Sequence, residues 1–296
     1  MFLCRAMLLL GTLALATIEH AANACAVCGC GDPTLTSLGV EKPYRNRVRL
    51  SLEFRHRTDA IGAPLVNQVR LFESRADVQV AWAPHERLFL LLTVPLLYRK
   101  TEAVNLAEDS TFGFGDLELR AKFFAFEDRA RRHLLSFIAG VKMPTAPGIV
   151  DDRGQLLRNE LQAGSGSVDP LFGIGYAYMP RPFSFYASLT GSLTTDGRSN
   201  ARGSRSLRAT TTLQRQWTPM VATRIGIDAR VDTVAVEGGR VEPDSGGFIA
   251  FFSPEFLLSP SEDWLVWLSA RIPTVNALTG FHHEGPVVSI GFARDF

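Results

Sequence analysis

The amino-acid sequence predicts an all-β protein, a closed antiparallel transmembrane β-barrel of about 12 strands (roughly 10–14). Three observations indicate this fold. Apolar and polar residues alternate with a period of two along much of the chain. The links between the expected strands are alternately short and long. The chain also ends in an aromatic residue, Phe296, on an alternating segment.

The composition excludes several classes of protein. Of 296 residues, 46% are hydrophobic and 21% are charged, and 31 basic side chains face 30 acidic ones. A disordered chain would be less apolar, and a nucleic-acid-binding protein that relies on bulk charge would be more basic. A helical membrane protein would carry several apolar runs of about 20 residues. A membrane barrel remains compatible with these numbers, and we expect no nucleic-acid partner.

Residues 1–24 have the pattern of a secretory signal peptide. Arg5 precedes an apolar run over 6–18, and small residues stand at 22–24. The run is too short to span a bilayer as a helix. We therefore expect export to the outer membrane of a Gram-negative bacterium. Residues 25–44 then form a Cys-rich periplasmic segment, and 45–296 form the barrel.

The Cys-rich segment carries Cys25, Cys28 and Cys30 in a CxxCxC pattern. Three alternatives stay open for these thiols. The oxidising periplasm favours a disulfide. Three neighbouring thiolates would suit a soft metal, copper or zinc. Cys25 would also be the first residue after cleavage, where a lipid can be attached. No other cofactor is expected.

The alternation is clearest in four segments, residues 47–57, 75–82, 116–123 and 221–232. In the first, Val48, Leu50 and Phe54 share one face, whereas Arg49 and Glu53 share the other. Eight weaker strands are expected at 87–98, 133–143, 168–178, 183–194, 206–217, 247–258, 264–273 and 286–296. The count is even, as in bacterial outer-membrane barrels.

The links separate a barrel from a sandwich. Short links are expected at 83–86, 127–132, 179–182, 218–220 and 259–263, and four of these five contain proline. Long polar links are expected at 58–74, 99–115, 144–167, 195–205, 233–246 and 274–285. Short periplasmic turns and long external loops are typical of outer-membrane barrels.

Aromatic residues gather where the short turns are expected. Trp82, Tyr178 and Trp217 end strands there, and Phe183 and Trp264 begin strands there. Such side chains concentrate at membrane interfaces. The terminal Phe296 resembles the signal by which outer-membrane assembly machinery recognises its clients, although Arg294 departs from the usual hydrophobic residue two positions earlier.

Charged residues on the other face of the strands are expected to line the lumen, because charges facing lipid cost about 2–4 kcal/mol at mid-membrane. The main candidates are Arg47, Arg49, Glu53, Arg75, Asp77, Asp116, Glu118, Arg120, Lys122, Lys142, Arg224, Asp228 and Arg230. Further candidates are Arg55, Arg208, Arg271, Asp169, Asp232, Asp263 and Asp295. A water-filled selective passage and a lumen braced by ion pairs are both compatible with this set. We favour a narrow passage that is obstructed by the loop 144–167.

Three stretches resemble one known family. They are Gly113–Leu119 with Lys122, Gly140–Thr145 and Gly164–Asp169. Their order and spacing are similar to those of the outer-membrane transporters of the "meta-pathway of phenol degradation" family, over about residues 85–296. Ala146 stands where that family usually has glycine. The resemblance implies a barrel that passes small aromatic or hydrophobic compounds.

The chain lacks the sequence motifs of an enzyme. No GxSxG, HExxH or phosphate loop occurs, and no histidine lies in a serine-containing motif. The sequence therefore predicts a non-enzymatic outer-membrane channel or transporter for small solutes, embedded in the lipid bilayer. The alternative is an outer-membrane anchor or metal-handling component that acts through the CxxCxC segment.

Overall fold

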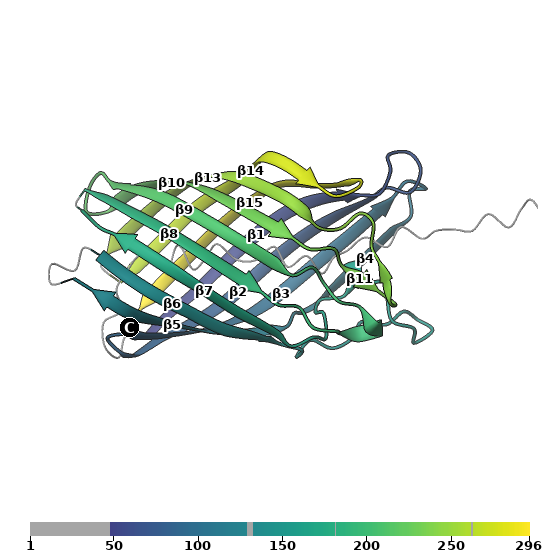
Figure 1. Cartoon of the computed structure of the whole chain (residues 1–296), viewed down its shortest axis with the longest axis horizontal. Helices are drawn as coiled ribbons and strands as arrows, with labels where there is room; N and C mark the ends of the chain where they lie inside the picture. The colour runs from purple at the N-terminus through teal and green to yellow at the C-terminus, as the bar shows by residue number, and fades with distance from the viewer. Residues whose placement is uncertain (1–47, 129–132, 181, 262) are drawn as a thin grey trace, which may run out of the picture.

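The computed structural model describes residues 48–128, 133–180, 182–261 and 263–296, which form a closed antiparallel β-barrel of 12 strands (Figure 1). The predicted fold class and strand number are confirmed. Within these ranges, no helix is long and apolar enough to cross a membrane. The predicted signal peptide, Cys25, Cys28, Cys30 and Arg47 lie outside the described residues.

Thirteen segments build the wall, because one strand is interrupted. In chain order they are β1 Val48–Ile61, β2 Val69–His85, β3 Leu88–Ala103, β4 Glu108–Phe114, β5 Leu117–Glu127, β6 His133–Met143, β7 Asp169–Tyr178, β8 Phe183–Ser192, β9 Ser206–Gln216, β10 Val221–Asp232, β13 Gly247–Ser261, β14 Trp264–Leu278 and β15 His282–Asp295. The segments β4 and β5 follow one another along β3 and together form the fourth strand. The loops add the hairpin β11 Val236–Glu237 and β12 Arg240–Val241, and the 3-10 turns η2 Asn159–Leu161 and η3 Arg198–Asn200.

The barrel closes where its first and last strands meet. β1 pairs with β2 on one side and with β15 on the other. The closure reaches the last residue, since the Phe296 N–H donates to the Val48 carbonyl at 2.8 Å and the Val48 N–H donates back at 3.2 Å. A sheet closed in this way satisfies its backbone groups internally, which lipid requires.

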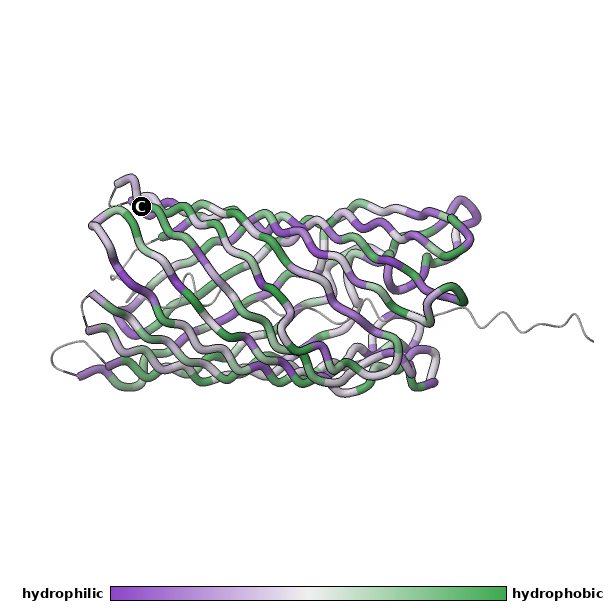
Figure 2. Tube along the Cα trace, turned by 90° about the horizontal axis from the view of Figure 1, so that it is seen from above, coloured by the Kyte–Doolittle hydropathy of each residue, from purple (hydrophilic) through white to green (hydrophobic). Residues whose placement is uncertain are grey.

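Side chains alternate between the two surfaces of the wall. Along β10, Arg224, Asp228 and Arg230 are buried inside, whereas Ile225 and Ile227 are 50% and 58% exposed outside. Figure 2 shows the same alternation of hydrophilic and hydrophobic residues along the strands. An outer surface this rich in exposed apolar side chains is suited to a bilayer and not to water.

At each of the five predicted short turns one strand ends and the next begins within a few residues, although β2 continues to His85 and β13 to Ser261. These strand ends lie at the left end of the barrel in Figure 1. Three of the predicted long links are wrong. β1 continues to Ile61 and β2 starts at Val69. The links are also short between β3 and β4, at 104–107, and between β14 and β15, at 279–281. These strands continue as hydrogen-bonded ladders beyond the apolar band, so the apolar alternation stops before the strands do.

The aromatic residues at the short-turn end face outward. Trp82, Trp217, Phe183 and Trp264 are exposed, and Tyr178 is half-buried. The Arg294 guanidinium lies 5.4 Å from the Trp264 ring centroid and 4.9 Å from that of Phe296. A cation over aromatic faces at an interface is stabilising, which accounts for arginine at this position.

The interior at the short-turn end contains apolar clusters, with the charged Arg49, Asp295 and Lys122 beside them. Three clusters of buried side chains line it from different strands: Ala81, Leu91 and Ile138; Phe124, Leu134, Ala177 and Tyr186; and Ala222, Leu257, Trp267 and Ala293. Farther from this end, charged side chains replace them. The inner surface is therefore richer in apolar side chains near the short turns and richer in charged ones farther away.

The outward position of Ile227 leads to a test of the membrane-facing surface. We expect Ile227→Lys to lower the free energy of unfolding in lipid by roughly 2–4 kcal/mol, since a charge would face the hydrocarbon core. Val221→Lys, at the short-turn end of the same face of β10, should cost only about 0–1 kcal/mol. Urea unfolding in vesicles measures both, and equal costs would contradict this placement of the bilayer.

Candidate functional site

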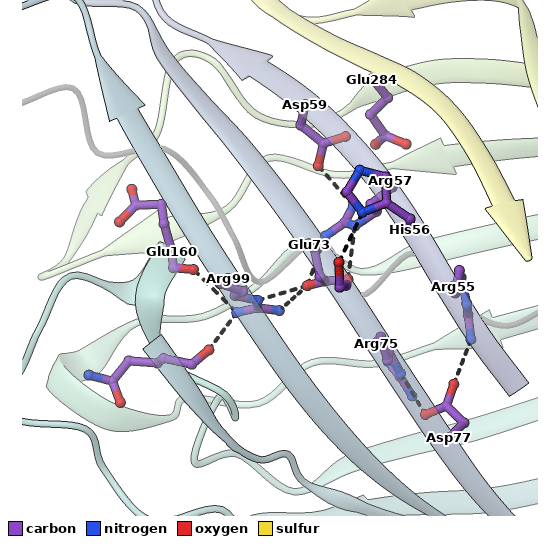
Figure 3. Close-up of polar contacts among 12 residues, drawn as sticks. Arg55, His56, Arg57, Asp59, Glu73, Arg75, Asp77, Arg99, Glu160 and Glu284 are labelled. Atoms are coloured by element: carbon purple, nitrogen blue, oxygen red, sulfur yellow. Dashed lines mark hydrogen bonds and ion pairs between the residues drawn. The ribbon is translucent and has the colours of Figure 1, made fainter. Parts of the chain in front are cut away.

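A row of buried charges crosses three neighbouring strands. Arg57, Glu73 and Arg99 stand directly opposite one another on β1, β2 and β3. The Glu73 carboxylate accepts from Arg57 Nε at 2.9 Å and from Arg99 Nη2 at 2.7 Å (Figure 3). The strand register thus places one carboxylate between two guanidinium groups. The hydrogen bonds between them are charge-assisted and therefore strong.

A second carboxylate is shared in the same way, one step toward the short-turn end. Asp77 Oδ2 accepts from Arg55 Nη2 at 2.7 Å, and Asp77 Oδ1 accepts from Arg75 Nε at 2.6 Å (Figure 3). Asp77 is 1% exposed. A carboxylate this deeply buried requires such partners, because an isolated charge would be strongly destabilising.

The third shared carboxylate belongs to the far wall of the lumen. Asp228 on β10 lies 3.3 Å from Arg208 Nε on β9 and 3.6 Å from Arg271 Nη1 on β14. Among the described residues, none donates a hydrogen bond to either Asp228 oxygen, and none accepts one from the Arg208 guanidinium. These atoms keep hydrogen-bonding capacity for water or solute.

A cavity of about 50 Å³ adjoins Asp228, large enough to hold water. Three kinds of side chain line it. Arg224, Arg271, Asp228, Glu53 and Glu255 supply charge, Thr210, Thr212, Ser253, Ser269 and Ser289 supply hydroxyl groups, and Trp267 supplies an aromatic surface. The cavity therefore offers charge, hydrogen bonds and an apolar face within one small volume.

Other charged candidates are also paired. Arg49 contacts Asp295 at 2.7 Å and Arg224 contacts Glu255 at 2.8 Å, whereas Arg230 contacts both Asp232 and Glu284. Arg120 pairs with Glu118, Lys142 with Asp169, and Arg55 Nε lies 3.8 Å from Glu53. Lys122 Nζ lies 5.2 Å and 5.4 Å from the ring centroids of Phe124 and Tyr186.

Two predicted lumen residues lie elsewhere. Asp263 is exposed in the turn between β13 and β14, because the strand starts one residue later, at Trp264. Asp116 is buried but belongs to the interruption between β4 and β5 instead of a strand. Its carboxylate accepts hydrogen bonds from the loop that follows β6. The strand boundary explains Asp116, since period-two alternation does not locate the residue at which a strand begins. Asp263 already lay in the predicted link 259–263, and its assignment to the lumen was wrong.

The sequence-based assignment missed several charges of this network. Five charged residues at or just beyond the ends of the predicted strands are buried or form buried ion pairs. They are Arg57, Asp59, Glu73, Arg99 and Glu284. Charges continue at period two through Glu53, Arg55, Arg57 and Asp59. That charged row is the signal that could have extended the first strand.

The loop 144–168 lies against the network. Arg99 Nη1 donates to the Glu160 carbonyl at 3.4 Å and also to the Gln162 carbonyl, and Thr111 Oγ1 donates to the Leu161 carbonyl at 2.7 Å. Asn159 Nδ2 donates to Glu237 Oε1 at 2.5 Å, which joins this loop to hairpin β11–β12. Side chains of the charged network thus hold the loop.

The Cys-rich segment lies outside the described residues. In the ranges that the structure covers, no group of three or more His, Cys, Asp or Glu side chains is arranged to hold a metal ion. The possible disulfide, metal or lipid at Cys25, Cys28 and Cys30 stays a prediction. A thiol count with and without reductant, together with metal analysis of the purified protein, distinguishes the three alternatives.

The sequence matches no protein-family model and no curated protein. Solved structures are similar. The COG4313 outer membrane channel from Pseudomonas putida F1 has 15% identity and a TM-score of 0.67, covering 87% of this chain and 98% of that one. The translocator domain of the autotransporter NalP from Neisseria meningitidis has 10% identity and a TM-score of 0.52, covering 89% and 93%. The fold is therefore that of Gram-negative outer-membrane β-barrels.

The docked loop contains a buried carboxylate whose protonation can be tested. Burial, with a smaller contribution from the nearby Glu237 and Glu242 carboxylates, raises the pKa of Glu160 to about 7, although a backbone hydrogen bond and Arg158 act in the opposite direction. Because the pKa of Glu160 is raised in the docked loop, the protonated carboxyl stabilises docking. This contribution is complete below about pH 4.5 and is lost as the pH rises through about 7.

We therefore expect the loop to become more mobile between pH 5.5 and pH 8. A spin label at Arg153→Cys, in a chain whose other cysteines are serine, reports this mobility. Glu160→Gln should remove the pH dependence, and a label at Glu86→Cys in a short turn should show none. A pH response that persists in Glu160→Gln would contradict the assignment to Glu160.

Proposed function

We propose that the protein is an outer-membrane channel that passes small solutes through its narrow, charged lumen. The observation that carries this proposal is the polar interior of a closed barrel whose outer surface is apolar. A barrel that served only as an anchor could be filled by an apolar core. Charged residues inside a membrane are retained where they meet water, partners or a solute pathway.

The shared carboxylates give the lumen a defined recognition chemistry. Asp77 and Glu73 each accept hydrogen bonds from two arginines, and Asp228 forms longer ion pairs with two. A guanidinium has five N–H donors, so an arginine that spends one or two on a carboxylate can offer others to a passing solute. Fixed donors along the wall favour solutes with at least one polar or anionic group.

The apolar end of the lumen favours solutes that also have an apolar part. Tyr186 and Phe124 are packed in a buried apolar cluster there, and Trp267 lines the cavity beside Asp228. The resemblance of the three sequence stretches to transporters of phenol degradation agrees with this class, and the similarity to an outer-membrane channel of Pseudomonas putida agrees with a channel role. We infer that small compounds with an aromatic or hydrophobic part are the cargo, and that no chemical reaction is involved.

The orientation follows from the loops. Short turns face the periplasm in bacterial outer-membrane barrels, so the turns and Phe296 would face that side and the loops 144–168, 193–205 and 233–246 would face outward. We propose that the outer-membrane assembly machinery recognises the strand that ends in Phe296. The lipid bilayer is the other partner of the outer surface.

Permeation itself is the decisive measurement. Purified protein in liposomes is exposed to sugars, amino acids and aromatic acids of graded size, and the swelling rate is recorded. We expect swelling with the smallest solutes and a steep decline with size, because the lumen holds many side chains. Absence of swelling with every solute, together with absence of conductance in planar bilayers, would contradict the channel and favour the anchoring alternative.

Arg224 tests whether the charged wall faces the pathway. Its side chain points inward, donates to Glu255 and lines the cavity beside Asp228. We expect Arg224→Glu, and likewise Arg49→Glu, to move the reversal potential in a salt gradient toward cation selectivity. Arg215→Glu is a matched control, since Arg215 is exposed and lies 3.9 Å from the Trp217 ring on the outer surface. An unchanged reversal potential in Arg224→Glu would exclude it from the pathway.

A further inference from the structure

Two arginines on the outer surface share one arrangement at the short-turn end. Arg215 on β9 is the direct ladder partner of Phe183 and stands two residues before Trp217. Its guanidinium carbon lies 5.7 Å from the Phe183 ring centroid and 3.9 Å from that of Trp217. Trp217 is held in turn, since its Nε1 donates to Thr223 Oγ1 at 2.8 Å. The guanidinium group is therefore fixed in place by two rings.

The same arrangement recurs where the barrel closes. Arg294 on β15 is the direct ladder partner of Trp264 and stands two residues before Phe296. Its guanidinium carbon lies 5.4 Å and 4.9 Å from the centroids of these two rings. In both cases the ladder partner is the first residue of the preceding strand, β8 or β14. We call each set of one arginine and two aromatic residues a clamp.

Both guanidinium groups keep their hydrogen-bond donors available. Within the described part of the chain, their contacts are with rings, and no carboxylate pairs with Arg215 or Arg294. The adjacent Asp295 binds Arg49 on the inner side instead. A guanidinium that stacks on a ring uses its face, so the N–H groups along its edge stay free. These donors match a phosphate group, which an arginine can bind through two parallel hydrogen bonds.

The clamps stand at the boundary of the apolar outer surface. The outward side chain that precedes Arg215 on β9 is Leu213, and the one that precedes Arg294 on β15 is Phe292, and both are exposed. Tryptophan rings at such a boundary lie at the level of the lipid headgroups. Both arginines therefore face lipid phosphates and not the aqueous space below them, which favours a lipid over an acidic protein segment as the partner.

We propose that each clamp binds the phosphate of an anionic glycerophospholipid in the leaflet that meets the short turns. The acyl chains of this lipid lie along the apolar side chains that precede the arginine on its strand. Four steps from strand to strand separate β9 from β15. With neighbouring strands about 4.8 Å apart, the clamps are two independent sites. The binding does not depend on the channel function, and only the assignment to the periplasmic leaflet rests on the proposed orientation.

The clamps carry their own reporters, because Trp217 and Trp264 each belong to one of them. One chain keeps Trp217 as its single tryptophan and another keeps Trp264, with phenylalanine at the other tryptophan positions. Each is folded into phosphatidylcholine vesicles that contain rising fractions of dibrominated phosphatidylglycerol or of dibrominated phosphatidylcholine. Bromine quenches tryptophan fluorescence only at short range, so the two quenching curves give the relative affinity of the two lipids at that clamp.

We expect phosphatidylglycerol to bind about fivefold more tightly than phosphatidylcholine at each clamp, which is the contribution of one basic side chain at an anionic lipid surface. Arg215→Gln should abolish this preference at Trp217 and leave it unchanged at Trp264. Arg294→Gln should do the reverse, so each variant is the matched control for the other. Conductance in planar bilayers, measured in the same variants, tests the channel separately and should not change.

Equal affinities of the two lipids at both tryptophans of the parent chain would overturn the proposal and leave an acidic periplasmic segment as the partner of the arginines. A preference that persists at Trp217 in Arg215→Gln, or that is lost there and at Trp264 together, would also overturn it. Inorganic phosphate should lower the preference no more than sodium chloride of equal ionic strength. A larger effect of phosphate would mean that the clamps bind the free ion and not a lipid.

Discussion

The structure depends on one constraint, that every backbone N–H and C=O group in lipid must find its partner within the protein. Closing the sheet between Val48 and Phe296 satisfies this constraint over almost the entire wall. The charged lumen follows from the closure, because a two-residue period that turns apolar side chains to lipid turns the others inward. The inward side chains are then free to carry charge, provided that each charge has a partner.

The same constraint is met differently at β4, which among the described residues pairs only with β3. The loop 144–168 lies against the inner side of this part of the wall and is held by Asp116, Thr111 and Arg99. These side chains connect the wall to the charged network inside, since Arg99 binds the loop and Glu73 at once. Arg99 therefore connects the loop, the wall and the charged side chains of the lumen through hydrogen bonds.

The sequence was sufficient for the barrel, its strand number and its short turns, because alternation and proline-containing links are local signals. It was insufficient where the signal is not local. Glu73 and Glu284 lie where the outer surface is no longer apolar, so the alternation that marks a strand had faded although the ladder continued. Asp116 and Ser165 are 49 residues apart, and only the folded wall shows that they meet.

The row of Arg57, Glu73 and Arg99 has a consequence for assembly. These residues are exact neighbours only in the native register of β1, β2 and β3. A slip by one residue would turn the slipped strand over, so that its charges would face lipid while their former partners stayed inside unpaired. The ion pairs thus favour the native alignment of these three strands over one that is shifted by a residue.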